Sequence, residues 1–271
     1  MKRTLVSVLT LIVMLSLTSF AASLTAKVVL PDGNGAPFAE VKIGEKTFVA
    51  DEKGNVELTY NSEKNALVKW LDLEEELPIG DTMKFSNKKL YGAPYDPFDW
   101  LVSGSETWDI DDKIMANPGG EHNEAQIFLD DEFDDFIVRS KFVAAAPSQW
   151  YYVRFFLRGA EPGFNGYGIS FAANPSDQTF FARFEGSWDK YEQITDSLFV
   201  YPAVEQNVPH EFVGFLKNDH IVLYLRAQGE SKYHKLVDVV DDSDGALFDG
   251  SVSILNSFCD VEISEFSIFK Y

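Results

Sequence analysis

Arginine and aromatic side chains alternate along two segments of the chain. Residues 150–158 have a period of two, which places Tyr152, Arg154 and Arg158 on one face of a predicted strand. Residues 179–185 repeat the pattern. A guanidinium group stacks on aromatic rings and donates hydrogen bonds in a fixed fork, which sugar hydroxyls and carboxylates both accept. The predicted ligand-binding residues are Tyr152, Arg154, Arg158, Phe181, Arg183, Glu185, Trp188 and Tyr191.

The same arginines also admit a structural interpretation. Five arginines follow Arg3, and three of them lie in these two segments of an acidic chain. In the structural interpretation they pair with carboxylates and brace a sheet, without binding a ligand. The two interpretations differ in whether Arg154, Arg158 and Arg183 line an open hollow or lie buried beside carboxylates.

No catalytic residue is predicted. Glycoside hydrolases need two carboxyl groups facing one cleft, and residues two apart on a strand share a face. No such pair occurs on a predicted strand, and the consecutive acids at 130–132 and 134–135 are expected in a solvated turn. Motifs of the Gly-x-Ser-x-Gly, His-Glu-x-x-His and phosphate-loop types are also missing. Whether the protein is an enzyme stays open, with non-catalytic binding favoured.

Two acidic stretches suggest metal ligands. The first is Asp238, Asp241, Asp242 and Asp244, which precede Gly245, and carboxylate oxygens beside a glycine turn suit structural Ca²⁺. Their spacing does not match an EF-hand, and an acidic surface turn is the alternative. The second is the Glu-His-Asn-Glu stretch at 121–124, for which a solvated polar loop is the alternative. No other cofactor is expected.

Charge and composition exclude several classes of partner. The chain has 271 residues, of which 43 are acidic and 23 basic, giving a formal charge of −20. A surface this negative repels phosphates, which argues against nucleic acid and an anionic membrane surface. Cys259 is the single cysteine, so an intramolecular disulfide and a cysteine-based zinc site are excluded. Aromatic residues make up 14% of the chain, which favours sheets.

The N-terminus has the three-part pattern of a secretory signal peptide. Lys2 and Arg3 are positive, residues 5–17 are mostly apolar, and small residues precede a cleavage site after Ala21. The apolar run is short for a transmembrane helix. We therefore expect a signal peptide at 1–21 and a secreted, periplasmic or cell-surface protein without stable membrane insertion.

Hydrophobic periodicity predicts an all-β protein in two parts. Residues 22–88 contain short alternating strands separated by turns such as 51–55, where Gly and Asn suit positive φ. Residues 88–98 contain two prolines and a glycine, which break helix and strand, and are predicted to connect the two parts. Residues 89–271 contain a longer series of strands, as in a jelly roll or two-sheet sandwich.

The last predicted strand contains an irregularity. Its apolar phase slips between Ile263 and Phe266, which indicates a β-bulge.

The first part resembles a known module. Residues 28–30, 32–37, 39–41 and 50–56, in that order and spacing, resemble the carboxypeptidase regulatory-like, transthyretin-like module. The resemblance covers about residues 23–88 and implies a small β-sandwich. Such modules usually act as spacers or accessory domains on exported proteins, and their turn motifs indicate fold rather than function.

The second part resembles another family through the order of several short motifs. These motifs are at 108–112, 125–129, 133–138, 150–155, 166–169, 181–184, 250–254 and 261–266. The series is similar to laminin-G-like, concanavalin A-like sandwiches, especially the branch once grouped with 3-keto-disaccharide hydrolases. The resemblance implies a concanavalin A-like jelly-roll sandwich, a fold that sometimes carries structural calcium.

These observations together predict an exported, non-catalytic protein whose second domain binds carbohydrate or a cell-surface glycan on an arginine-rich aromatic face. Two alternatives stay open. One is a glycosidase-like hydrolase of the keto-disaccharide branch, for which loss of turnover on mutating Glu185 would be diagnostic. The other is a structural or adhesive envelope protein with protein-binding surfaces.

Overall fold

The structure is a computed structural model. It describes residues 21–86, 89–91, 100–104, 108–109, 114–116, 124–129, 131–145, 152–160, 163–172 and 177–270. All regular secondary structure in these residues is β-strand, which confirms the predicted all-β fold class. Among the same residues, no helix is long and apolar enough to cross a membrane. The chain divides into two compact units between Ser86 and Asn87. The predicted signal peptide lies outside the described residues, apart from Ala21.

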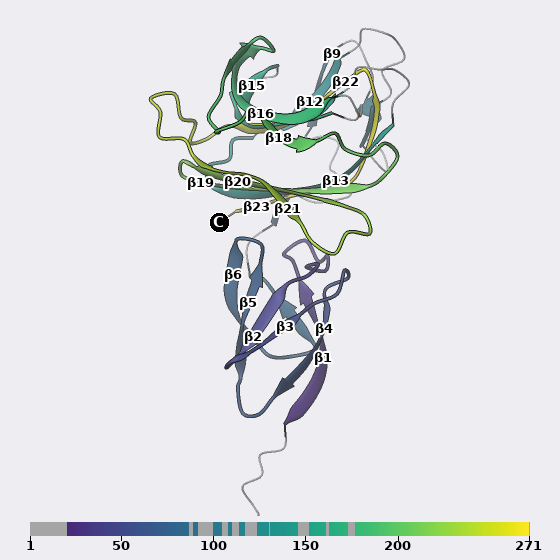
Figure 1. The fold of residues 1–271 in the computed structure, drawn as a ribbon, viewed down its shortest axis with the longest axis vertical. Coiled ribbons are helices and arrows are strands. Elements are labelled where there is room, and N and C mark those ends of the chain that lie inside the picture. Colours follow the sequence, from purple (N-terminus) through teal and green to yellow (C-terminus); the bar gives the residue numbers. More distant parts are fainter. Residues whose placement is uncertain are drawn as a thin grey trace, which may run out of the picture. The chain divides into compact units, whose positions relative to one another are not determined.

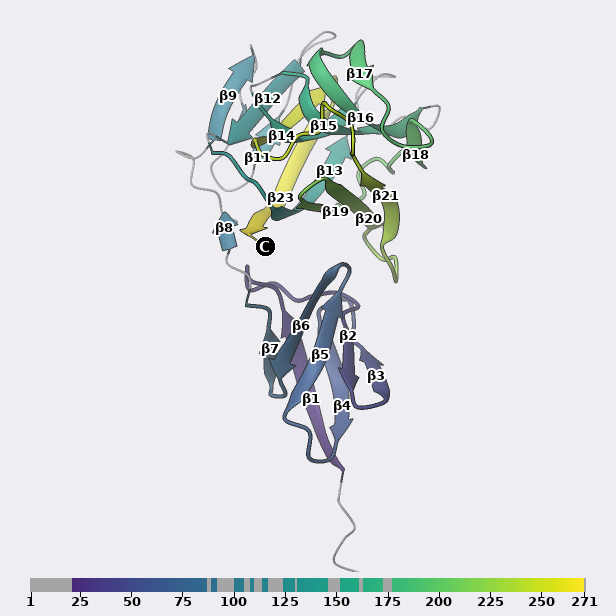
Figure 2. The ribbon, with the colours of Figure 1, turned by 90° about the vertical axis from the view of Figure 1, so that its left-hand side faces the viewer.

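The first unit is built from two sheets (Figure 2). Its strands are β1 (Ala22–Val29), β2 (Glu40–Ile43), β3 (Lys46–Val49), β4 (Asn55–Tyr60), β5 (Asn65–Trp70), β6 (Leu73–Pro78) and β7 (Thr82–Lys84). One sheet has the order β4-β1-β7, with β7 parallel to β1, and the other has the order β3-β2-β5-β6. Alternate residues of both sheets, including Val28, Leu58, Val41 and Val68, are fully buried.

The turn at 51–55 forms between β3 and β4, where the sequence predicts one. The Asp51 carboxylate accepts hydrogen bonds from the backbone N–H groups of Lys53 and Asn55, each at 2.8 Å. Gly54 has a φ of +83°, and a Cβ at this position would lie 2.6 Å from the carbonyl oxygen of Val28. The turn therefore requires glycine for both its conformation and its close approach.

The second unit is a sandwich of two larger sheets, which form separate layers in Figure 1. Its strands are β8 (Lys89–Tyr91), β9 (Trp100–Gly104), β10 (Trp108–Asp109), β11 (Ile114–Ala116), β12 (Glu124–Leu129), β13 (Phe136–Ala145), β14 (Tyr152–Gly159), β15 (Asn165–Ala172), β16 (Gln178–Ser187), β17 (Lys190–Glu192), β18 (Phe199–Pro202), β19 (His210–Lys217), β20 (His220–Ala227), β21 (His234–Val240), β22 (Ser251–Ser257) and β23 (Asp260–Lys270). The first sheet, called the β13 sheet, has the order β10-β11-β23-β13-β19-β20-β21, with β8 beside β23. The second, called the β14 sheet, has the order β17-β16-β15-β14-β22-β12-β9, with β18 beside β16.

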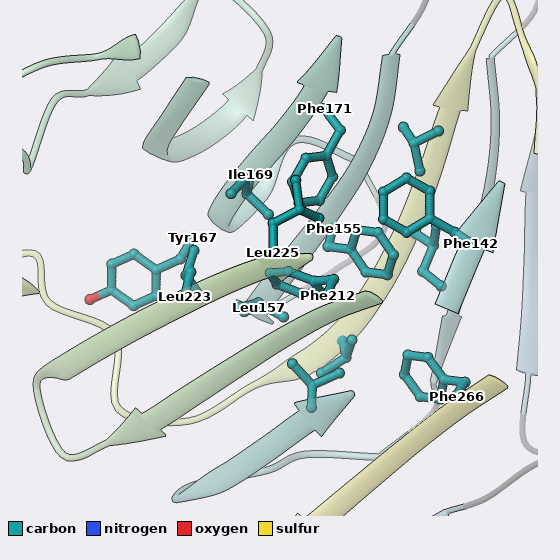
Figure 3. Close-up of a cluster of buried hydrophobic side chains, with 14 of the residues drawn as sticks. Phe142, Phe155, Leu157, Tyr167, Ile169, Phe171, Phe212, Leu223, Leu225 and Phe266 are labelled. Carbon is teal, nitrogen blue, oxygen red and sulfur yellow. The ribbon is translucent and has the colours of Figure 1, made fainter. Parts of the chain in front are cut away.

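An aromatic core holds the two sheets together. Figure 3 shows Phe142 of β13 and Phe212 of β19 meeting Phe155 and Phe171 of the β14 sheet. The Phe155 ring centroid lies 5.7 Å from that of Phe142 and 4.9 Å from that of Phe212. Such ring pairs contribute about 0.5–1.5 kcal/mol each beyond the area that they bury. This core fixes which face of the β14 sheet points inward and which points outward.

The structure confirms one predicted irregularity and corrects one predicted connection. Pairing between β13 and β23 passes from Glu265 to Ile263 and skips Ser264, which confirms the β-bulge. The connector predicted at 88–98 is wrong for residues 89–91, because these residues form β8 and pair with β23. The backbone of an edge strand is stabilised by its neighbour, and a nearby proline does not prevent this pairing.

Candidate functional site

A pocket of about 570 Å³ opens on the outer face of the β14 sheet. The described residues that line it are Tyr152, Arg154, Phe164, Asp177, Gln178, Phe180, Phe184, Trp188, Tyr191, Leu198 and Phe199. Seven of these eleven side chains are aromatic, and one is a cation. The volume lies within the range of about 300–1,000 Å³ that is usual for small-ligand sites.

Cross-strand register determines which side chains reach the pocket. Arg154 of β14 pairs with Ser170 of β15, which pairs with Phe180 of β16, and all three lie on the outer face. The next row, from Phe155 through Ile169 to Phe181, lies in the core. Successive residues of a strand point to opposite faces. Tyr152, two residues before Arg154, and Phe184, four residues after Phe180, therefore also lie on the outer face.

The floor of the pocket is a second, smaller cluster of packed rings. Phe156 contacts Phe184 edge to face, with ring centroids 5.5 Å apart, and contacts Phe164 at the same distance. Gly168 of β15 lies beneath two of these rings. A Cβ on Gly168 would lie 2.6 Å from Phe184 and 2.8 Å from Phe156. Glycine is therefore needed here so that the rings can approach the backbone.

The rim of the pocket comes from the segment 186–199, which includes β17 and leads into β18 (Figure 2). Trp188 is 70% exposed, Tyr191 is 47% exposed and Phe199 is 53% exposed. Tyr191 lies opposite Phe184 across the β16–β17 pair, with ring centroids 6.0 Å apart. Three large exposed rings around one pocket form an apolar patch of the kind that marks a binding surface.

Polar groups lie beside the rings. The Arg154 guanidinium is 4.7 Å from the ring centroid of Tyr152 and 5.3 Å from that of Phe164. Its Nε donates a hydrogen bond to the hydroxyl of Ser170 at 3.1 Å, and Nη1 donates to the hydroxyl of Ser257. The Tyr152 hydroxyl donates to the carboxylate of Asp177 at 3.2 Å. Burial and the nearby Asp177 carboxylate raise the pKa of Tyr152, so this hydroxyl stays a donor.

The predicted binding face is wrong for Arg158. Its φ is +57°, and the pairing register of β14 shifts between Leu157 and Gly159, so the alternation ends before this residue. Arg158 is buried, and its guanidinium group donates hydrogen bonds to the backbone carbonyls of Asp134, Asn218 and Leu247 and forms an ion pair with Asp135. For this residue the structural interpretation is the correct one.

The predicted binding face is also wrong for Phe181 and Arg183. Both point to the inner side of β16, where Phe181 belongs to the core. Arg183 is buried and forms ion pairs with Asp241, at 2.7 Å, and with Glu192 of β17. The prediction placed Arg154 of β14 and Arg183 of β16 on the same face of the sheet. The pairing register instead aligns Arg154 with Phe180, so the odd-numbered residues of β16 face the opposite side.

Four of the other predicted residues line the pocket, and Glu185 does not. Trp188 and Tyr191 line the pocket, together with Tyr152 and Arg154. Glu185 is exposed and is not among the described lining residues. Sequence analysis missed the remaining lining residues, which are Phe164, Asp177, Gln178, Phe180, Phe184, Leu198 and Phe199. The tandem Phe180-Phe181 was a usable indication, because adjacent rings on a strand must face opposite sides.

Of the four carboxylates suggested as calcium ligands, Asp238 and Asp241 contact basic side chains, and Asp242 and Asp244 are exposed. Asp241 accepts hydrogen bonds from Tyr167, Arg183 and Ser243, so its carboxylate already has a cation beside it. Asp238 contacts Lys235 and His220 instead. No group of three or more His, Cys, Asp or Glu side chains that could hold a metal ion occurs in the described part of the chain. Residues 121–123 of the other suggested metal stretch lie outside the described residues.

Comparison with known proteins bears on the fold of this chain. No protein-family model and no curated protein matches the chain. A protein of unknown function with a galectin-like fold from Bacillus subtilis has 11% identity and a TM-score of 0.51, covering 67% of this chain and 96% of that chain. This likeness agrees with the predicted concanavalin A-like sandwich and concerns the fold alone.

Two further solved structures match with lower scores. Carbohydrate binding module CBM66 from Bacillus subtilis has 14% identity and a TM-score of 0.49, covering 64% of this chain and 96% of that chain. The exoplasmic/lumenal domain of VIP36, in its Ca²⁺/Man3GlcNAc-bound form, has 12% identity and a TM-score of 0.49, covering 68% of this chain and 90% of that chain.

Proposed function

We propose that the second unit binds carbohydrate in the aromatic pocket, without covalent chemistry. The observation that carries the proposal is the composition of the lining, where exposed rings surround a small set of hydrogen-bonding groups. Aromatic faces pack against the C–H faces of sugar rings, and the Tyr152, Arg154, Asp177 and Gln178 side chains offer donors and acceptors to hydroxyl groups. An apolar pocket with a few convergent polar groups is the usual form of a small-ligand site.

The described lining favours binding over hydrolysis. A glycosidase of the two-carboxylate type needs an acid and a second carboxyl group about 5–10 Å away across the scissile bond. Asp177 is the one carboxylate among the lining residues that the structure describes. Glu185, the residue on which the hydrolase alternative was to be tested, is not among those lining residues.

The direct test is a glycan array with the full mature chain, followed by titration calorimetry on the best neutral and acidic oligosaccharides. Binding with wild-type protein should be lost or strongly weakened in Arg154→Ala and Tyr152→Ala. The matched control is Tyr60→Ala, which removes an aromatic ring from the first unit. If no glycan binds, or if both pocket variants bind as the wild type does, the proposal is wrong, and a protein-binding role for the exposed rings is favoured.

We also propose that the protein acts outside the cytoplasmic membrane and that the first unit is a transthyretin-like accessory module. The support is the N-terminal signal pattern and the order of turn motifs in residues 23–88. N-terminal sequencing of the exported protein tests the first point, with Ala22 expected as the first residue. An uncleaved N-terminus would contradict it.

A further inference from the structure

We infer that the pocket accepts a neutral sugar and rejects sugars that carry a carboxylate or sulfate group. This inference rests on the proposed function and names the class of ligand. An arginine in a sugar site would ordinarily suggest an acidic ligand, because a guanidinium group binds carboxylates through two parallel hydrogen bonds. The contacts of Arg154, its carboxylate neighbour and the charge of the rim each indicate the opposite.

Arg154 is held by the protein in a way that disfavours a forked contact with an anion. Its Nε has a single hydrogen, and this hydrogen is donated to Ser170 at 3.1 Å. The side-on fork, which uses Nε and Nη2 together, is therefore already half occupied. The central carbon of the guanidinium lies over the rings of Tyr152 and Phe164. Arg154 is also only 8% exposed, which restricts the approach of a bulky anionic group.

A carboxylate of the protein already lies in the lining. Asp177 accepts the hydrogen bond of the Tyr152 hydroxyl at 3.2 Å, so its negative charge lies in the lining beside that hydroxyl group. A ligand carboxylate bound to the same polar groups would lie close to Asp177. Two like charges about 4 Å apart near a protein surface repel strongly enough to weaken binding about ten-fold or more. A sugar hydroxyl, by contrast, can donate a hydrogen bond to Asp177.

The rim adds to the repulsion of anions. The rim segment 186–199 carries two exposed carboxylates, Asp189 and Asp196, and one exposed cation, Lys190, while its third carboxylate, Glu192, is paired with Arg183. The whole chain has a formal charge of −20, so the field at the entrance opposes the approach of an anionic glycan. The apolar rings of the rim carry no charge and do not discriminate against a neutral ring.

The test compares each polymer with its own acidic form. Affinity electrophoresis is run in gels that contain laminarin, mannan or galactan, or the same polymer after oxidation of its C6 hydroxyl groups to carboxylates. At least one neutral polymer should retard the protein, and its oxidised form should bind about ten-fold more weakly at low salt. The difference should shrink as salt is raised, because the screening length falls to about 3 Å at 1 M.

Two variants separate local charge from overall charge. Asp177→Asn should reduce the ratio of the affinity for the neutral polymer to that for its oxidised form. Glu57→Gln, an equal change of charge in the first unit, should leave this ratio unaltered. Equal or tighter binding of the oxidised polymers overturns this inference but leaves carbohydrate binding in place. A preference that neither salt nor Asp177→Asn reduces also overturns it. Failure of all six polymers and of the glycan array together would instead refute the proposed function.

Discussion

Replacing Trp188 with Ala should weaken glycan binding about 10–20-fold and leave the fold nearly intact. Trp188 lines the pocket and is 70% exposed, so little of its surface is buried by folding. A buried aromatic side chain covers about 200 Å², of which roughly 60 Å² would be covered here before any ligand binds. At about 25 cal/mol per Å², the substitution should lower the free energy of unfolding by at most about 1.5 kcal/mol.

The loss in binding follows from the surface that remains exposed. A sugar ring that stacks on half of the exposed part of the indole would cover about 70 Å². The same coefficient gives about 1.8 kcal/mol, which corresponds to an increase in Kd of about 20-fold. Trp188 should therefore contribute more to the complex than to the folded protein.

The assay is titration calorimetry with the neutral glycan that binds best, together with urea unfolding of each variant. Phe248→Ala is the matched control, because Phe248 is 57% exposed and does not line the pocket. Quenching of tryptophan fluorescence by the ligand in the wild type, and its loss in Trp188→Ala, gives an independent measure, because the chain has five tryptophans. The reasoning is refuted if Trp188→Ala binds within two-fold of the wild type, or if Phe248→Ala weakens binding to the same extent.

Arg158→Ala should lower the free energy of unfolding in urea by about 3–5 kcal/mol, because it leaves buried carbonyl groups without a donor, and an effect below about 1 kcal/mol would contradict this. Glu192→Gln should weaken glycan binding a few-fold at nearly constant Tm, because it loosens the strand that carries Tyr191; calorimetry showing unchanged affinity would contradict it. Burial alone would raise the pKa of Glu211, but its two arginine neighbours outweigh burial and lower the pKa from 4.5 to about 2. Glu211 should therefore contribute about 3 kcal/mol to the free energy of unfolding above pH 4.5, and this contribution should be lost as the pH falls toward 2. Urea unfolding measured against pH should show that the free energy of unfolding of Glu211→Gln lacks this decrease. Gly168→Ala should cost about 1–3 kcal/mol by displacing the rings of the pocket floor, and wild-type stability in urea would show that the floor has room to adjust.

The sequence was sufficient to predict the β fold and part of the site. Alternation placed Tyr152 and Arg154 on one face of β14, and both line the pocket while Val153 and Phe155 lie in the core. Local period is a reliable guide within one strand, because the direction of each side chain is set by its own backbone. Trp188 and Tyr191, which the sequence analysis also named, follow directly after the predicted strand at 179–185 and line the pocket.

The errors arose where the geometry depends on more than one strand. Arg158 follows the expected alternation in sequence, but its positive φ at the end of β14 turns its side chain into the protein. Arg183 lies on the inner face because β15 sets the register between β14 and β16, and this register cannot be read from either strand alone. Phe164 and Asp177 come from loops, whose course depends on long-range packing.

The β16–β17 pair places Tyr191 on one side and Glu192 on the other, so a step of one residue separates the pocket lining from attachment to the scaffold. A combinatorial library directed at positions 188, 191 and 199 would vary the exposed rings while leaving the buried anchors intact. Under the proposed function, such a module could be directed toward another glycan without being redesigned as a fold, in the way that antibody loops are varied on a constant framework.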